Sequence, residues 1–200
     1  MAEIKDKDFG SYHIASELEY EHARSGFFSF IVNDIDNLVR SDFGEEEPED
    51  SDKIKDGVEK LKLSVIKVNV PHFSTTTIET RRGNSVVKYA GVPTFNSGEI
   101  TVQDYLGLSG KSILMAWQAL TYDVINDKGG RAKNYKKNCT LIEYTQDYKK
   151  VRSWDLIGCW PSEISEAEFD KSADSERTIT ATIQFDRAIM HDESEETFLA

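Results

Sequence analysis

With 200 residues, the chain is long enough for one domain that buries its own core without a metal or disulfide framework. Its net charge of -12 argues against a conventional nucleic-acid-binding protein, which needs a basic patch, and suits a surface that repels DNA or stays soluble when crowded. No apolar run approaches membrane-spanning length and the N-terminus has no signal-peptide core, so we expect a protein that stays in the cytoplasm where it is made.

The two ends of the chain and one internal segment stand apart from the main domain, which we place at residues 25–190. Residues 1–24 are charged and predict an N-terminal arm, with a weak helix as the alternative. Residues 41–57 are dominated by acids and predict an exposed insertion loop, whose spacing does not match an EF-hand calcium loop. Residues 191–200 predict a loose acidic tail.

The first half of the domain is rich in β-branched and aromatic residues, which favour strands. The expected strands are Phe27–Val32, Leu61–Val70, Thr75–Arg82, Ser85–Tyr89 and Glu99–Tyr105. Gly83-Asn84 predicts the turn of a hairpin between the third and fourth of them. Ala90–Gly98 predicts a turn-rich connector.

One helix is expected, at Lys111–Ile125, with Ser109 as a plausible N-cap. Its apolar stripe, typical of a packing face, is Ile113, Leu114, Trp117, Leu120 and Val124. The basic segment Arg131–Asn138 follows on a chain that is acidic elsewhere. It predicts either a solvated loop or a patch complementary to an acidic partner surface, such as the 45–52 run of a neighbouring copy.

The segments Cys139–Thr145 and Val151–Trp160 predict a hairpin around a polar loop, with Pro161 ending the second strand because proline has no N–H. An acidic connector, Glu163–Phe169, follows. Arg177–Arg187 predicts the last strand, because apolar residues alternate with polar ones along it.

The apolar pattern also predicts the register of this hairpin. Pairing Tyr144 with Trp154 places the large apolar residues on one face. The same register places Glu143 opposite Asp155 on the other face. Like charges directly opposite each other are unfavourable, so this face is either a solvated surface with an electrostatic role or a solvent-exposed surface without one. The alternative is that the true register differs by a residue or two.

Chemistry-bearing residues are few. The predicted register puts Cys139 opposite Cys159, near enough for a disulfide, but a reducing cytoplasm favours free thiols. The histidines have no ligand spacing, and no phosphate loop or Ser-His-Asp group is present. We therefore expect no metal, cofactor or catalytic site. A Glu143–Asp155 carboxylate pair, as in glycoside hydrolysis, is the one catalytic alternative.

The predicted architecture is mainly β with one flanking α-helix, an antiparallel sandwich or barrel. Several segments resemble, in the same order, those of contractile-tail phage tail tube proteins. They are Val68–Pro71, Arg81-Arg82-Gly83, Tyr89–Phe95, the helix with Trp117, Tyr135-Lys136-Lys137, Trp154–Ile164 and Phe185–Ala188. The likeness covers Leu61 to about Met190, and the acidic 41–57 run and the N-terminal segment look like additions to the family pattern.

The resemblance implies a structural virion protein rather than an enzyme. Its copies would form hexameric rings that stack into a hollow tail tube, with each subunit's sheet joining its neighbours' sheets around a channel. Implied partners are the tail sheath, baseplate hub and tape-measure proteins, and phage DNA that passes without specific binding. The implied location is the virion tail, after assembly in the host cytoplasm.

Candidate site residues follow from this interpretation. Glu143 and Asp155 are the expected lumen-facing acids. The expected contacts between subunits or rings are Glu45, Glu46, Glu47, Asp50, Arg131, Lys133, Lys136 and Lys137.

Three alternatives remain open. The first is the tube subunit of a type VI secretion or phage-derived contractile injection system. The second is a monomeric cytoplasmic β-rich binding module, which should not polymerise. The third is an enzyme, which would have a deep pocket and a titrating group of shifted pKa.

Overall fold

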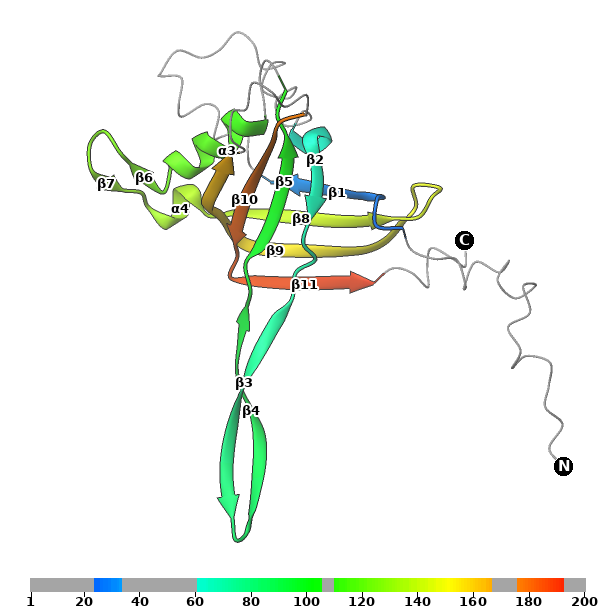
Figure 1. Ribbon diagram of the computed structural model, residues 1–200, viewed down its shortest axis with the longest axis vertical. Coiled ribbons are helices and arrows are strands. Elements are labelled where there is room, and N and C mark those ends of the chain that lie inside the picture. Colours follow the sequence, from blue (N-terminus) through cyan, green and yellow to red (C-terminus); the bar gives the residue numbers. More distant parts are fainter. Residues whose placement is uncertain (1–23, 34–60, 106–109, 167–175, 193–200) are drawn as a thin grey trace, which may run out of the picture.

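The computed structural model describes residues 24–33, 61–105, 110–166 and 176–192. Among these, two antiparallel sheets pack against each other and share one long strand, β9 (Lys150–Glu166) (Figure 1). Sheet I has the order β1-β8-β9-β11 and sheet II the order β9-β10-β5-β2. The expected β-sandwich is therefore confirmed.

The remaining strands of sheet I are β1 (Phe28–Val32), β8 (Lys137–Tyr144) and β11 (Arg187–Asp192). Those of sheet II are β2 (Val65–Val68), β5 (Gly98–Gln103) and β10 (Thr178–Gln184). A separate hairpin consists of β3 (Phe73–Arg82) and β4 (Ser85–Phe95). Beside the sandwich lie α3 (Gly110–Ala119), β6 (Tyr122–Asp123), β7 (Lys128–Gly129) and α4 (Ala132–Tyr135).

Strand β9 changes sheets at Gly158, where the backbone has φ +72. Residues up to Cys159 pair with β8 or β11, whereas Trp160–Glu166 pair with β10. A left-handed backbone conformation suits glycine, because other L-residues place Cβ too close to a carbonyl oxygen. The Asp186 main-chain N–H donates to the Ile157 carbonyl oxygen (2.9 Å), so the turn between β10 and β11 is held against the same corner.

The core lies between the two sheets and beneath α3. Its fully buried side chains include Trp117, Leu114, Ile179 and Val102. The Trp117 indole donates from Nε1 to the carbonyl oxygen of Tyr135 at 2.6 Å, so the polar atom of this buried ring is satisfied. The helix therefore closes one end of the sandwich through the stripe that the sequence predicts.

The predicted register of β8 and β9 is wrong. Trp154 lies opposite Leu141 and not Tyr144. The connecting loop is tighter than expected, since the Thr145 N–H donates to the Lys149 carbonyl oxygen (2.9 Å) and Tyr148 has φ 59. This tight turn shifts the pairing by three residues, and an odd shift exchanges the faces on which the side chains lie.

The shift also moves the two cysteines. Cys139 lies opposite Leu156, and Cys159 lies opposite Lys137, so they are not directly paired. Both thiols are free and buried, and burial raises the pKa of the Cys139 thiol well above its usual range.

Pro161 does not end the strand as predicted. It lies within β9, opposite Ile183, next to an irregularity between Thr182 and Ile183 where the pairing shifts. The missing N–H is tolerated there because the ladder is already interrupted. The strand continues to Glu166, into the segment expected to be an acidic connector.

Other boundaries also differ. Helix α3 ends at Ala119, and Val124, placed in its apolar stripe by the sequence, is 81% exposed in the loop between β6 and β7. The segment Ala90–Phe95 belongs to strand β4 and is no connector. Leu61–Ser64 is helical, so β2 is shorter than expected. The C-terminal strand is β11, which takes in the first two residues of the expected tail.

An ion-pair group joins the start of α3 to the end of β9. The Lys111 Nζ lies 2.8 Å from Glu166 Oε1, and the Arg177 guanidinium also pairs with this carboxylate. The hydrogen bond from Lys111, and the charges of Lys111 and Arg177, lower the pKa of Glu166 from 4.5. The folded state therefore favours the ionised carboxylate over the protonated form.

This shift predicts a pH dependence of stability. Because the pKa of Glu166 is lower in the folded chain, its contribution is present above pH 4.5 and is lost as the pH falls through the folded value. We expect Glu166→Gln to lower the free energy of unfolding at pH 7 and to have a smaller effect at acidic pH. Urea unfolding of both proteins across this range measures the difference, and an effect that grows toward low pH would contradict the assignment.

Candidate assembly surfaces

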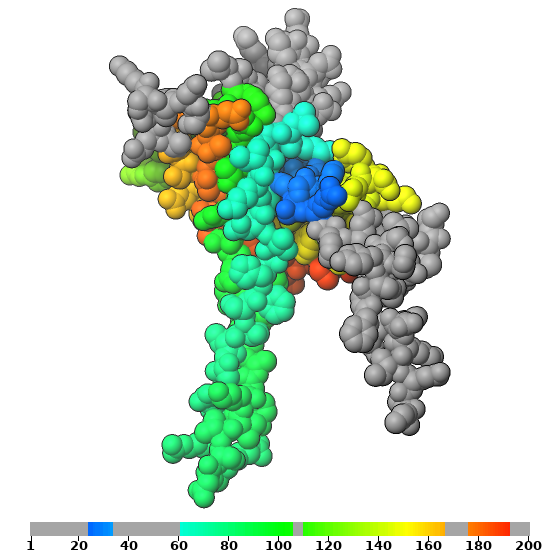
Figure 2. Space-filling view, turned by 45° about the vertical axis from the view of Figure 1, so that its right-hand side comes forward, coloured from blue at the N-terminus to red at the C-terminus, as the bar shows by residue number. Residues whose placement is uncertain are grey.

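The β3–β4 hairpin projects far from the sandwich, in line with the strands of sheet II (Figures 1 and 2). Every residue of β3 is exposed. An isolated two-stranded hairpin is marginally stable in water, because it has no layer to bury its side chains against. The hairpin therefore has the properties of a segment that is completed by a partner.

Apolar side chains on this hairpin strengthen that interpretation. Ile78 and Tyr89 lie directly opposite each other and are 55% and 46% exposed. Other exposed apolar residues on the hairpin are Phe73, Val86 and Val92. Large apolar side chains exposed on both faces of one element of a soluble protein suggest that the element is covered by a protein partner. The sequence predicts the hairpin but not this role; the available signal is that β3 has only Phe73 and Ile78 as apolar residues, too few for a buried strand.

The outward face of sheet II is uniformly polar. Its side chains alternate with the buried Ile100, Val102, Ile179, Ala181 and Ile183. The outward set is Lys67, Glu99, Thr101, Gln103, Glu163, Ser165, Thr178, Thr180 and Thr182. We call it the threonine face. Glu99 and Glu163 lie on either side of Thr182 in one row across three strands, which brings together two acids from distant parts of the sequence.

The two acids predicted to face a lumen are separated by the corrected register. Glu143 lies opposite Arg152, with 3.5 Å between its Oε2 and the Arg152 NH1, on the core-side face of sheet I. Asp155 lies opposite Thr140 on the outward face, and its Oδ2 is 3.2 Å from His191 Nε2. The two carboxylates do not flank a common space, so the catalytic pair considered for them is also wrong.

The predicted basic contacts fall into two groups. Arg131, which precedes α4, and Lys133, which lies within it, are exposed and form no ion pair with any described residue. Lys136 instead pairs within the chain, with its Nζ 2.7 Å from Asp186 Oδ2, and this hydrogen bond raises the pKa of Lys136. Lys137 begins β8. The predicted acidic contacts Glu45, Glu46, Glu47 and Asp50 lie outside the described residues, as do most of the N-terminal arm and C-terminal tail.

Within the described ranges, no three His, Cys, Asp or Glu side chains are grouped so that they could hold a metal ion. Across the same parts of the chain, no helix combines the length and apolar character needed to cross a membrane.

Comparison with known structures finds chains of similar fold. The chain is similar to the tube-terminating cap of the anti-feeding prophage, with 14% identity, a TM-score of 0.59, and coverage of 86% of this chain and 92% of that one. It is also similar to a chain of the sheath-tube complex of an extracellular contractile injection system, with 21% identity, a TM-score of 0.56, and coverage of 91% and 97%. At these identities the likeness concerns the fold.

Sequence comparison is more specific. The chain is 26% identical over 106 residues to the tail tube protein gp19 of Enterobacteria phage T4, and the match spans 52% of this chain and 65% of the T4 protein. Residues 53–188 match the family model described as T4-like virus tail tube protein gp19. This match takes in well over half of the chain, which therefore belongs to the T4-like virus tail tube protein family.

Proposed function

We propose that copies of this chain form hexameric rings that stack into the hollow tail tube of a contractile phage, through which DNA enters the host cell. Family membership is the first support, and the projecting β3–β4 hairpin is the structural observation that carries the proposal. A subunit whose exposed apolar hairpin contacts a different surface of the next copy makes a head-to-tail contact, which extends as a filament. The role is structural, without a catalytic step.

Sheet II supplies the edges for closing each ring. β2 forms one edge, and Trp160–Glu166 of β9 form the other, since among the described residues both pair on one side only. An unpaired edge exposes backbone N–H and C=O groups, and pairing with a neighbouring copy would satisfy them. Repeating this contact around the ring would join the sheets into a continuous barrel.

The threonine face is the proposed channel wall. Hydroxyl and amide side chains suit a water-filled channel, and Glu99 and Glu163 would repel phosphate. The outward face of sheet I suits this role less well, because Ile157 and Ile189 are 39% and 47% exposed on it. Glu99 and Glu163 thus replace the Glu143–Asp155 pair as the proposed lumen acids.

Reversing the charge of this wall is expected to slow DNA passage. In tubes that carry Glu99→Lys and Glu163→Lys, lysines would bind phosphate with counterion release, and we expect ejection to slow by about tenfold or more. Receptor-triggered DNA release from variant virions measures this rate. The matched Glu99→Gln, Glu163→Gln variant, which adds no positive charge, should be much less affected. Ejection at the normal rate from lysine-lined tubes of normal length would contradict the assignment.

The remaining proposals concern partners. We place the protein in the virion tail after assembly in the host cytoplasm, in contact with sheath, baseplate hub and tape-measure proteins. Arg131 and Lys133 are exposed and available as contacts between copies, with the acidic Glu45–Asp50 segment of a neighbour as the proposed counterpart. Residues 1–24 are the proposed arm that orders on a neighbour.

A phage-derived contractile injection system is the second candidate. The fold likeness to a chain of such a system's sheath-tube complex, at 91% coverage of this chain, favours it. Nucleic acid separates the two machines, because particles purified from the producing cell should hold DNA in the first case and none in the second.

Electron microscopy of the purified full chain across a concentration series tests the proposal. Hollow rings and tubes are the expected result. Particles that stay monomeric at every concentration, and also when purified baseplate is added as a template, would overturn it and favour a monomeric binding module.

A further inference from the structure

The loop between β6 and β7 presents two apolar side chains to solvent. Val124 and Ile125 are 81% and 93% exposed, and Ile125 is more exposed than any other large apolar residue described. Tyr122 and Met115 lie beside them, at 46% and 45% exposed, and line a hollow between this loop and α3. We call Val124 and Ile125 the β6–β7 tip.

The tip is held in one conformation. The Asp123 carboxylate accepts hydrogen bonds from the main-chain N–H of Ile125 (3.0 Å) and Asn126 (3.3 Å), and from Asn126 Nδ2 (2.7 Å). The Asn126 side-chain hydrogen bond is the main cause of a lowered pKa of Asp123. At the base, the Gly130 N–H donates to the Thr121 carbonyl oxygen (2.9 Å). A loop fixed in this way loses little conformational entropy on binding.

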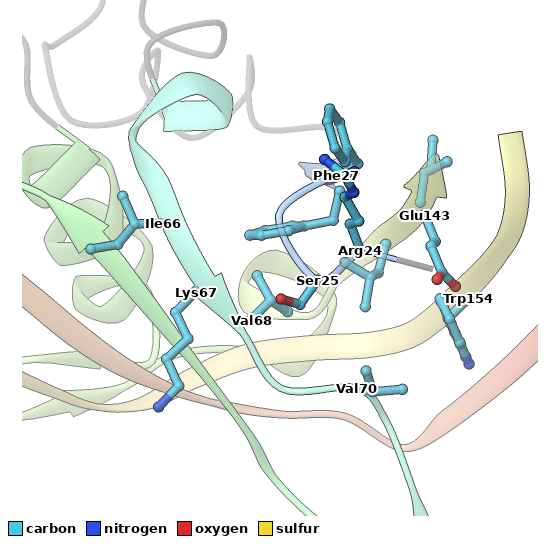
Figure 3. Close-up of a pocket in the computed structure, with 12 residues that line it drawn as sticks. Arg24, Ser25, Phe27, Ile66, Lys67, Val68, Val70, Glu143 and Trp154 are labelled. Carbon is cyan, nitrogen blue, oxygen red and sulfur yellow. The ribbon is translucent and has the colours of Figure 1, made fainter. Parts of the chain in front are cut away.

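A mainly apolar groove, which suits an apolar tip, lies on the opposite side of the sandwich. It has a volume of about 510 Å³ and lies between β1 and β2, which are edge strands of the two sheets among the described residues. Ile66 and Val68 line one side and Trp154 the other, with Phe27 above (Figure 3). Its lining is therefore mainly apolar, open at the surface and bounded by two sheet edges.

Charged groups on the two surfaces can be matched. Glu143 lies at the groove beside Trp154, and Lys128 begins β7 directly after the tip loop. Arg24 and Lys67 also line the groove, and Asp127 lies within the tip loop. Acids and bases on one surface thus have counterparts of opposite sign on the other.

The placement of the two surfaces fits a ring. In Figure 1 the tip lies beyond the β9 edge of sheet II, whereas the groove adjoins β2, the other edge. When the β9 edge of one copy meets the β2 edge of the next, the tip is carried toward the groove. A head-to-tail contact of this kind closes into a ring when the rotation permits.

We propose that the β6–β7 tip of one copy docks into the β1–β2 groove of the next copy in the same ring. This inference rests on the proposed tube function and names the contact that holds each ring. The β3–β4 hairpin projects from a different part of the subunit, along the strands of sheet II, and serves the contact between rings (Figure 1). Each subunit thus has one surface that closes the ring and a separate surface that stacks one ring on the next.

Cross-linking between differently marked copies tests the contact. Full-length Ile125→Cys protein is mixed with full-length Ile66→Cys protein, assembled, and treated with a short bismaleimide reagent. The native Cys139 and Cys159 are 1% and 0% exposed, so they react slowly in the folded chain. We expect covalent dimers from the mixture and none from either variant alone. The parallel mixture of Val86→Cys with Ile66→Cys examines whether the hairpin occupies the groove instead.

The outcomes separate this inference from the proposed function. Tubes that yield the 125–66 dimer support it. Normal tubes without that dimer, or with the 86–66 dimer in its place, overturn the inference and leave the tube function standing. Absence of rings and tubes from the unmodified protein, with and without baseplate, overturns both.

Discussion

A subunit that carries Ile78→Asp and Tyr89→Asp is expected to fold normally and to form no tubes. The two residues face each other across β3 and β4 and are 55% and 46% exposed, far from the buried core. In an assembled tube the same positions would be enclosed by a neighbour. An unpaired charge buried in that way costs about 3–5 kcal/mol, and every copy would carry two such charges at the stacking contact.

The measurement has two parts. Thermal unfolding of the sandwich should be nearly unchanged, because the hairpin lies outside its core, and the two opposed aspartates should weaken only the pairing of β3 with β4. Electron microscopy should show isolated rings or subunits. The matched control is Lys149→Asp on the exposed β8–β9 loop, which also changes the net charge by -2 and should assemble. Tubes of normal length from the double variant would show that the hairpin does not join rings.

Gly158→Ala is expected to lower the free energy of unfolding markedly, because it affects both the backbone conformation and the packing where β9 changes sheets. A non-glycine residue at φ +72 costs roughly 1–2 kcal/mol, and the added Cβ would overlap the Asp186 carboxylate. Displacing Asp186 also disturbs its ion pair with Lys136 and the turn into β11. We expect a total loss of roughly 2–4 kcal/mol in the free energy of unfolding.

Urea unfolding compares this variant with Gly129→Ala. No atom lies within 4 Å of a Cβ at Gly129, and its φ is not in the left-handed region, so that control should unfold almost as the parent does. Equal midpoints for the two variants would mean that β9 does not depend on Gly158 to pass from one sheet to the other.

Much of the fold follows from local sequence pattern. Alternating apolar residues locate β10, the Gly83-Asn84 pair locates the β3–β4 turn, and the helical stripe through Trp117 locates α3. These features depend on residues close together in the chain, where propensity and periodicity act directly.

The register of β8 and β9 depends on a detail that pattern does not reveal. A tyrosine in the left-handed region, Tyr148, makes the loop tighter than its polar composition suggests. One short turn then moved Glu143 and Asp155 to opposite faces. Where a strand's pairing is set by a turn of unusual conformation, the side-chain face cannot be read from alternation alone.

The candidate surfaces were harder to predict. Glu99 and Glu163 lie in the same row of the sheet because β10 lies between β5 and β9 and places Thr182 opposite both residues. The sequence predicts that β3 and β4 form a hairpin. It does not predict that the hairpin projects away from the sandwich, because this depends on where β2 and β5 end in the folded chain. Charge-rich segments can be recognised in the sequence, whereas the exposed apolar side chains can be recognised only in the folded chain.

A cryo-electron microscopy reconstruction of assembled tubes would show which face of the subunit lines the channel and what each hairpin contacts. We expect the threonine face of sheet II to line the channel, with Glu99 and Glu163 in rings around it, and each β3–β4 hairpin to cross into the adjacent ring. A channel lined by the outward face of sheet I, with Ile157 and Ile189 on its wall, or hairpins that point away from every neighbouring subunit, would contradict this expectation.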